Sequence, residues 1–276
     1  MSKIFIYIQE RFPVAPVLLF AFGYAALATG ISETPPTKIL QIIVLFSGIF
    51  FFFLLRQRVV DEFKDSSHDL KNFPDRPVPR GLISKRQLVL LGLVALLLEW
   101  SCVYLLGSNS LVAYLPVFLY SLLMAKEFFI SDWLNRHFNL YLLSHEVIFI
   151  FFGLFFMLVT NENLMTNSFP LVLGTLTVAP VSVEIIRKFS PRYDKKGKAV
   201  QDTYSTVWGR NVALTILILL SFFTALFLTI IKNSPYFLLL ILITLCILFV
   251  MKSSDKAVKI IGAINFLGLA ILANIF

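Results

Sequence analysis

The chain has 276 residues, of which 58% are hydrophobic and only 14% are charged, and its formal net charge is +8. A soluble domain has roughly 45–50% apolar and about 25% charged residues, so this composition excludes an ordinary soluble globular protein. The two cysteines, Cys102 and Cys246, lie inside apolar runs and form neither a disulfide framework nor a metal-type spacing. These features predict a polytopic membrane protein.

Nine stretches are long and apolar enough to cross a membrane, which takes about 20 residues for a core of about 30 Å. In chain order we expect these helices over about 14–32, 38–55, 87–106, 109–126, 140–160, 169–187, 211–231, 235–251 and 257–276. The first stretch follows basic residues, as in a secretory signal peptide, but it has no convincing cleavage site and more spans follow. We therefore predict an all-α membrane protein with a single domain over residues 1–276.

The positive charges predict the topology of these helices. All Lys and Arg residues except Lys38 and Lys232 fall on one side of the nine-helix arrangement. Because short cytoplasmic loops are enriched in Lys and Arg, we expect the N-terminus and both long loops, about 56–86 and 188–210, to be cytoplasmic. The C-terminus would lie on the opposite face of the cell (inner) membrane. Since topology accounts for the basic loops, we expect membrane lipids and no nucleic acid as partners.

The first long loop begins with carboxylates at intervals of four residues: Asp61, Asp65 and Asp69. This spacing keeps them on one face of a helix, where they repel one another unless a cation lies among them. Mg²⁺ prefers one or two carboxylates together with substrate phosphates. The prolines that follow should fix an extended path that holds Arg76 and Arg80 near the carboxylates. Solvated charges at a helix end are the alternative interpretation, but they need no such spacing.

These residues also resemble a known motif. Asp61-Glu62-x-x-Asp65-x-x-x-Asp69, followed by Arg76-Pro-x-Pro-x-Gly81, is similar to the first aspartate-rich motif of the UbiA superfamily of intramembrane prenyltransferases. The family form is Asn-Asp/Gln-x-x-Asp-x-x-x-Asp with an Arg-Pro-x-x-x-Gly tail, at the end of the second helix. Here Asp and Glu replace the first two residues, which keeps oxygen ligands. The resemblance covers nearly the whole chain and implies nine transmembrane helices around a central cavity.

The resemblance implies roles for the residues of this motif. Asp65 and Asp69 would be catalytic residues that bind Mg²⁺ and, through it, the diphosphate of the substrate, and Asp61 would be a further metal ligand. Arg76 would bind the diphosphate directly.

A second, weaker part of the resemblance lies at the end of the sixth predicted helix, where the family has Asp-x-x-x-Asp. Glu184 can stand for the first of these residues as a catalytic metal ligand, but Lys188 occupies the place of the second. A further metal ligand would come from Asp194 or Asp202, of which we choose Asp202 because it opens a stretch similar to the family's following loop. Arg187 and Lys188 could instead neutralise the diphosphate. An acid inside a span is costly unless it has a partner or a task.

Two further polar positions lie near or within the predicted spans. Tyr120 and Lys126 end the fourth helix, where family members often carry a Tyr and Lys/Arg pair that holds diphosphate, so we assign diphosphate binding to Lys126. The spacing between the two is longer here than in the family. Glu99 lies within the third helix, and we expect it to make a structural hydrogen bond or to lie at the far interface.

The sequence therefore predicts an enzyme, a prenyltransferase that moves an alkyl or aryl group other than methyl. With Mg²⁺ as cofactor it would transfer a prenyl group from a polyprenyl diphosphate donor to an aromatic or other lipophilic acceptor in the membrane. A non-catalytic UbiA-like protein that binds isoprenoid or lipid is one alternative, suggested by the altered second motif. A small-molecule transporter is the other, but it predicts acids deep in several spans, whereas these acids gather at one face.

Overall fold

The computed structural model describes residues 2–32, 34–160, 166, 168–250 and 254–276, and these are helical apart from loops and one short hairpin. Contacts between Cα atoms divide the chain into two compact units. The first unit comprises Met1–Phe22 and Leu40–Ile148, and the second comprises Gly23–Ile39 and Phe149–Phe276. Helices α2 and α3 each begin in one unit and end in the other. The expectation of a single domain over 1–276 stays a prediction.

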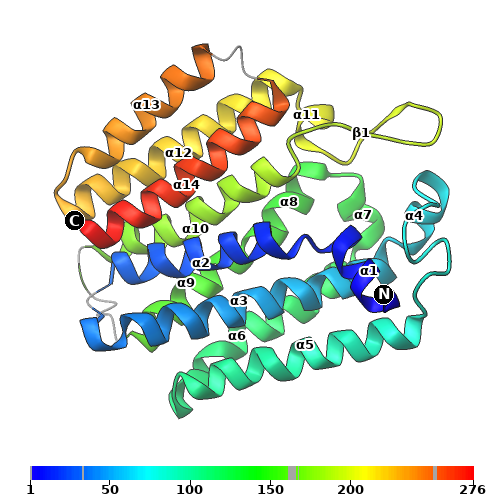
Figure 1. Ribbon diagram of the computed structural model, residues 1–276, viewed down its shortest axis with the longest axis horizontal. Coiled ribbons are helices and arrows are strands. Elements are labelled where there is room, and N and C mark those ends of the chain that lie inside the picture. The colour runs from blue at the N-terminus through cyan, green and yellow to red at the C-terminus, as the bar shows by residue number, and fades with distance from the viewer. Residues whose placement is uncertain (1, 33, 161–165, 167, 251–253) are drawn as a thin grey trace. The chain divides into compact units, whose positions relative to one another are not determined.

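The first unit contains the elements up to the middle of the chain (Figure 1). Their bounds are α1 Lys3–Arg11, α2 Val14–Gly30, α3 Pro36–Lys64, α4 Ser66–Asn72, α5 Lys85–Leu105, α6 Ser108–Ala125, the 3-10 turn Glu127–Phe129, α7 Ser131–Asn135 and α8 Phe138–Glu146.

The second unit contains the remaining elements. Their bounds are α9 Ile148–Val159, α10 Phe169–Arg187, β1 Arg192–Tyr193, β2 Ala199–Val200, α11 Tyr204–Val207, α12 Arg210–Lys232, α13 Tyr236–Val250 and α14 Asp255–Ile275.

The nine predicted membrane stretches coincide with helices as far as they are described. Among the described residues, seven helical segments are long and apolar enough to span a membrane, or eight if α1 and α2, which bend by 59°, form one broken span. Helix α13 is apolar but shorter, and residue 251, the end of that predicted stretch, lies outside the described residues. The all-α membrane fold is confirmed, and nine helices is an approximate number.

Side chains next to the helices define several of their ends. Ser84 and Gln87 form a reciprocal capping box at the start of α5, which satisfies backbone N–H groups that have no partner within the helix. Ser254 caps α14 by accepting the N–H of Ala257. At the C-terminal end of α12, Asn233 adopts the left-handed conformation, with φ 49°, that often terminates helices. These local signals place the loops between the apolar segments.

In the first unit, α1 packs against α3 and α5. One cluster of buried side chains contains Tyr7, Val59, Ile83 and Leu88, and a neighbouring cluster contains Phe12, Leu55 and Ala95. Each cluster combines residues from before α2, from α3 and from the region of α5. The contacts therefore fasten the N-terminal helix to the end of α3, where the aspartate motif begins.

In the second unit, α10, α12, α13 and α14 pack as neighbours (Figure 1). The end of α2 belongs to this unit and lies close to α14. A Cβ atom built on Gly30 would be 2.7 Å from the carbonyl carbon of Ala273, so only glycine permits this backbone approach. Small residues at such contacts are typical of helix packing in membranes, where tight van der Waals contact replaces the hydrophobic effect.

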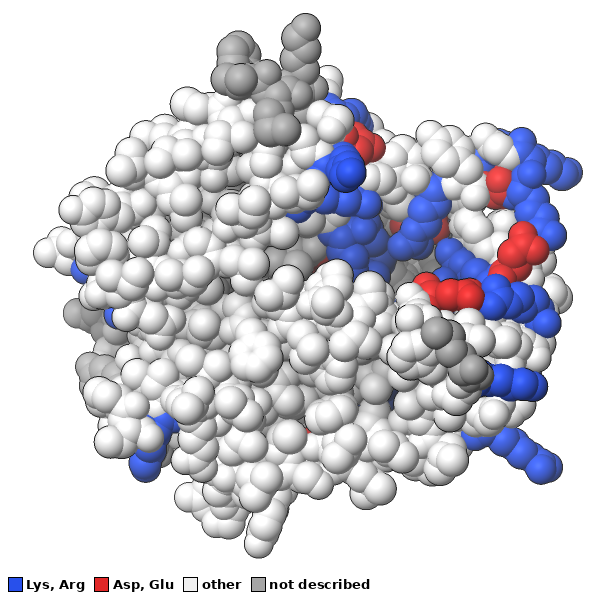
Figure 2. All heavy atoms as spheres, viewed as in Figure 1, with Lys and Arg blue, Asp and Glu red and all other residues white. Residues whose placement is uncertain are grey.

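The charged side chains occupy a small part of each unit. In each unit, Figure 2 shows Lys, Arg, Asp and Glu side chains gathered mainly at one end of the helices, with other residues along their lengths. This distribution matches helices that are surrounded by lipid and bounded by water.

Candidate active site

The aspartate motif lies at a helix break in the first unit. Helix α3 ends at Lys64 and α4 begins at Ser66, with Asp65 between them. The backbone N–H of Asp65 still donates to the carbonyl of Asp61, and that of Asp69 donates to the carbonyl of Asp65, both at 2.8 Å. The four-residue register therefore continues through the break. The side chains nevertheless differ in exposure: that of Asp61 is 42% exposed and that of Asp69 only 3%.

Two of the motif's acids are buried in a network of arginines. Glu62 Oε1 accepts hydrogen bonds from Arg11 Nε at 2.8 Å and from Arg58 Nη2 at 2.6 Å. Asp69 accepts from Arg11 Nη2 at 3.1 Å and from Arg76 Nη1. Arg11 thus joins the two carboxylates from the end of α1. Buried carboxylates need such partners, because burial of an unpaired charge is strongly unfavourable.

Asp61 has a looser partner. Lys64 Nζ lies 4.0 Å from Asp61 Oδ1 and 3.5 Å from Glu127 Oε1. The ammonium group is therefore shared between the end of α3 and the turn that follows α6. A shared, partly exposed pairing of this kind contributes little stability and is easily exchanged for another ligand.

Asp65 is the acid of the motif with the least compensation. It is half-buried, and no hydrogen-bonded or ion-paired partner of its carboxylate is found among the residues that the structure describes. Burial raises the pKa of Asp65, and the neighbouring charge of Asp61 raises it further. A cation bound here would relieve both effects, because an opposite charge favours the ionised carboxylate.

The proline-rich tail does not follow the expected extended path. Residues 74–80 form consecutive turns, in which the fixed φ of proline is favourable. The turns bring Arg76 back to Asp69, with its guanidinium carbon 3.8 Å from the ring centre of Phe73. Arg80 instead donates to Glu10 at 2.7 Å and to the carbonyl of Asp75 at 2.7 Å. The expectation that Arg80 lies against the aspartates is wrong, and its hydrogen bond to Glu10 raises its pKa.

In the second unit, Glu184 is paired with its own neighbours. Its carboxylate accepts from Arg187 Nε at 2.6 Å and lies 3.1 Å from Lys188 Nζ. Arg187 is the last residue of α10 and Lys188 follows it, so the two lie three and four residues after Glu184. Side chains at this spacing meet on one face of a helix. The acid that sequence reasoning singled out as costly inside a span therefore has two cationic partners.

The other acids of the second loop also have local partners. Asp202 Oδ2 lies 3.2 Å from Arg192 Nη1 in the β1–β2 hairpin, whereas its other oxygen, Oδ1, is buried without a hydrogen bond in the described part of the chain. Asp194 accepts the backbone N–H groups of Lys196 and Lys198 at 2.8 Å. Asp194 therefore shapes the hairpin turn, while Asp202 keeps one oxygen available.

Lys126 caps the C-terminal end of α6, and its side chain is exposed. Tyr120 donates to the carbonyl of Ser144 at 2.5 Å, so it points to α8. The lysine that the structure places beside carboxylates of this unit is Lys64, next to Asp61 and Glu127, which sequence reasoning treated only as a topology signal.

The described residues contain no group of three or more His, Cys, Asp or Glu side chains arranged to hold a metal. This still fits Mg²⁺, which usually keeps one or two carboxylates and takes its other ligands from phosphates and water. Asp61 and Asp65 are the two carboxylates of the motif that the arginines leave available.

Sequence reasoning missed the part that Arg11 plays. It lies about 50 residues before Glu62, and no spacing rule connects the two. The one available signal is that Arg11 lies two residues before Pro13, which marks a helix end on the Lys- and Arg-rich side where the motif is also expected. Glu62 is only 3% exposed, and this burial too could be found only from the folded structure.

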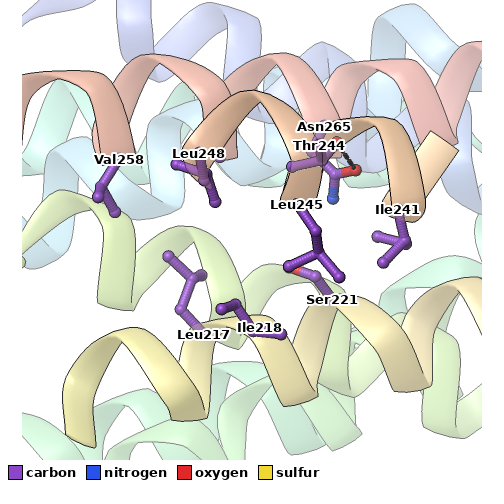
Figure 3. A pocket seen from close by; sticks show the side chains of 10 residues that line it. Leu217, Ile218, Ser221, Ile241, Thr244, Leu245, Leu248, Val258 and Asn265 are labelled. Atoms are coloured by element: carbon purple, nitrogen blue, oxygen red, sulfur yellow. Dashed lines mark hydrogen bonds between the residues drawn. The ribbon is translucent and has the colours of Figure 1, made fainter. Parts of the chain in front are cut away.

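A small cavity in the second unit is unrelated to these acids. It has about 20 Å³ of space, roughly enough for one water molecule. Apolar side chains of α12, α13 and α14 line it, and the hydroxyl of Thr244 donates to Asn265 Oδ1 at 3.0 Å at its edge (Figure 3). A prenyl chain would not fit there.

Comparison with known proteins agrees with this fold. A UbiA homologue from Aeropyrum pernix K1 has a TM-score of 0.59 at 13% identity, with 94% of this chain and 98% of that one covered. A UbiA homologue from Archaeoglobus fulgidus bound to GPP and Mg²⁺ has a TM-score of 0.55 at 16% identity, over 98% and 99%. A digeranylgeranylglyceryl phosphate synthase has a TM-score of 0.53 at 18% identity, over 100% of both chains.

Among curated proteins, no sequence match was found. The model of the UbiA prenyltransferase family matches residues 17–264, a range that holds the aspartate motif, Glu184 and all but the ends of the chain. The chain is an integral membrane protein that belongs to the UbiA prenyltransferase family.

Proposed function

We propose that this protein is a Mg²⁺-dependent prenyltransferase that moves a prenyl group from a polyprenyl diphosphate to a lipophilic acceptor within the membrane. The observation that carries the proposal is Asp65: a half-buried carboxylate next to Asp61, with a raised pKa and no paired cation in the described residues. Such a group is unfavourable for stability and is typical of a functional site. Family membership and the prenyl diphosphates bound to the Archaeoglobus homologue support the donor class.

In this proposal Asp61 and Asp65 would hold Mg²⁺, which would supply positive charge to stabilise the diphosphate leaving group. Asp69 is a weaker candidate for a direct ligand, because Arg11 and Arg76 already occupy its oxygens. It would hold Arg76 toward the diphosphate, and it could join the metal if the arginines move to the substrate. Lys64 and Lys126 are further cations of this unit that could bind the diphosphate.

The reaction is a substitution at the first carbon of the prenyl group. The C–O bond to the diphosphate breaks, and the electron pair leaves with the diphosphate oxygen. Cations around the leaving group stabilise the charge that develops there. The acceptor then supplies an electron pair to the allylic carbon and releases a proton to water or a nearby carboxylate. An aromatic acceptor is one class among several that this fold can host.

Glu184, Arg187, Lys188 and Asp202 have a smaller role in this proposal. Arg187 and Lys188 now pair with the carboxylate of Glu184. If the diphosphate displaced this carboxylate, the two cations could bind it instead. Asp202 Oδ1 could add one oxygen ligand. We assign Arg187 and Lys188 to the diphosphate, with both motifs on the cytoplasmic side and the C-terminus on the other face.

A second candidate function is binding of isoprenoid or lipid without turnover. Lys188, where the family has an acid, favours it: the cation pairs with Glu184 and removes one expected metal ligand.

The experiment uses the full-length protein purified in detergent, with geranylgeranyl and longer prenyl diphosphates and a panel of aromatic and lipid acceptors. We expect pyrophosphate release and prenylated product that require Mg²⁺ and disappear in Asp65→Asn. The matched control is Asp132→Asn, an exposed carboxylate on α7 of the same unit, which should retain activity. Tight diphosphate binding with no release for any acceptor would favour the non-catalytic function, and absence of binding would refute both.

A further inference from the structure

A second polar cluster lies buried between three helices of the first unit. Arg56 on α3 makes two hydrogen bonds to Glu99 on α5, Nε to Oε2 and Nη2 to Oε1, both at 2.8 Å. Tyr114 on α6 donates to Glu99 Oε1 at 2.7 Å. Glu99 and Tyr114 are fully buried and Arg56 is 7% exposed. The structural hydrogen bond that we expected for Glu99 is confirmed.

The polar groups of this cluster contact one another and neighbouring aromatic rings. Both oxygens of Glu99 accept hydrogen bonds, and the guanidinium of Arg56 also lies 5.4 Å from the ring centre of Phe53 and 5.5 Å from that of Phe118. Apolar replacements of buried ion pairs often maintain or improve stability, so such pairs are weak evidence of a stabilising role. Their best-attested use is to fix one register between helices.

The other close contacts between α3 and α5 join apolar or small residues. The helices are antiparallel, and their close points are Val59 against Gly92, Leu55 with Ala95, and Gly48 against Cys102. Gly92, Ala95 and Cys102 are small, which permits close packing in a membrane. Ile, Leu, Val and Phe occupy most positions of α3 before Arg56, so a rotated α3 would still present apolar side chains to α5 there. A shift of one residue would rotate α3 by about 100° and break the hydrogen bonds of Arg56.

Rotation of α3 matters because the helix continues without interruption from Arg56 to Asp61 and ends at Lys64. The two positions are five residues apart, about 7.5 Å along the axis. Asp65 follows at the break. The direction in which the motif's carboxylates point is therefore set by the same helix rotation that the cluster fixes.

We propose that Arg56, Glu99 and Tyr114 are positioning residues, which hold α3 in one register against α5 and α6 and so present Asp61 and Asp65 to the metal and diphosphate. The metal-binding part of this inference rests on the proposed function. The register part does not, and the two can be tested separately.

The chain offers a reporter of the register. A Cβ atom on Gly48 would lie 3.0 Å from the Sγ of Cys102, close to the separation that a disulfide requires. Gly48→Cys in a Cys246→Ser background should therefore form an intramolecular disulfide with Cys102 under mild oxidation. Cross-linking would be followed by the loss of free thiol and by mass, and needs no enzymatic activity.

The test compares two versions of this reporter protein, without and with Arg56→Met, Glu99→Leu and Tyr114→Phe. Removing the whole cluster leaves no buried charge or hydroxyl without a partner, so the protein should still fold. We expect slower cross-linking in the triple variant. Without the reporter substitutions, its affinity for Mg²⁺ with inorganic pyrophosphate, measured by calorimetry, should fall by about 10-fold or more, as for other losses of support around metal ligands. The Arg56→Lys variant keeps the charge but loses the paired hydrogen bonds. Its cross-linking rate and its affinity should lie between those of the unaltered protein and the triple variant.

The matched control removes a partly buried interhelical polar pair of the second unit from the reporter protein, with Thr244→Val and Asn265→Leu (Figure 3). This variant should cross-link at the original rate. Cross-linking of the triple variant at the original rate would refute the register role. Slower cross-linking with unchanged binding of Mg²⁺ and pyrophosphate would refute the positioning role. If the unaltered protein releases no pyrophosphate from any donor, the proposed function fails, while cross-linking still decides the register.

Discussion

The acids of the aspartate motif and Glu184 solve the same electrostatic problem in different ways. Glu184 pairs with cations three and four residues away. Glu62 and Asp69 are paired by Arg11, from 51 and 58 residues earlier in the chain, and Asp65 has no paired cation among the described residues. The local pairing forms wherever α10 forms, but the long-range network exists only in the folded first unit.

The difference indicates where charge is held for function. A helix can neutralise an acid such as Glu184 at little cost, since neighbouring side chains meet anyway. The first unit instead keeps four carboxylates within one segment, pairs two of them firmly, and leaves Asp61 and Asp65 weakly compensated. Weakly compensated carboxylates of this kind are typical of a functional site, and the proposed function places a divalent cation there.

The largest expected effect is on catalysis. Asp65→Asn should lower pyrophosphate release by at least about 10²-fold, comparable to the loss of a main electrostatic contact in other enzymes. Glu184→Gln should lower it by only about 10-fold, the scale of a supporting contact. Steady-state rates at saturating Mg²⁺ measure both. Equal losses would show that the two regions contribute alike and would overturn the comparison.

Next is the stability of the two pairings. Arg11→Met should reduce the free energy of unfolding by about 2 kcal/mol, somewhat less than the usual cost of breaking a buried pair, because Arg58 and Arg76 still contact the acids. Arg187→Met should cost less than about 1 kcal/mol, since the Arg187 side chain is 56% exposed. Denaturant unfolding of both variants in one detergent gives the values. A larger loss for Arg187→Met would contradict this ranking.

A smaller effect concerns the pH dependence of stability. The pKa of Asp65 is raised in the folded protein, so the folded state binds this proton more tightly than the unfolded chain does. Stability should therefore fall as the pH rises from about 4, the ordinary value, through the raised pKa. Asp65→Asn should remove this part of the fall and raise the melting temperature of the metal-free protein at neutral pH. Identical melting profiles for the two proteins would exclude this strain.

The smallest effect is expected for Arg80→Ala. Arg80 also contacts the N-terminal helix, through Glu10, but both side chains are 38% exposed. Exposed ion pairs contribute little to stability because water and salt screen them. The melting temperature of Arg80→Ala should not change measurably, whereas that of Arg11→Met should fall. Comparing the two variants tests whether burial of the ion pair, and not merely its contact with α1, determines its contribution to stability.

The sequence alone predicted much of the fold and part of the site. Apolar segments of membrane length located the helices, because a backbone in lipid must satisfy its own hydrogen bonds. The spacing of Asp61, Asp65 and Asp69 located the motif, and its backbone bonds kept the four-residue register. The break at Asp65 and the turns of the tail were not predicted, since both accompany contacts with α1 that are distant in sequence, such as Arg11 with Asp69 and Val78 with the cluster that contains Tyr7.

Sequence by itself determined the class of protein, the positions of the spans, the family and the local partners of Glu184. Hydropathy and helical spacing carry these features, and both act over a few residues. Only the tertiary structure decided that Arg11 joins Glu62 to Asp69, that Arg56 pairs with Glu99 and Tyr114, and that Asp65 is left with a raised pKa. These outcomes depend on burial and on which distant side chains meet, because the energy of a charge depends on its surroundings far more than on its neighbours in the chain.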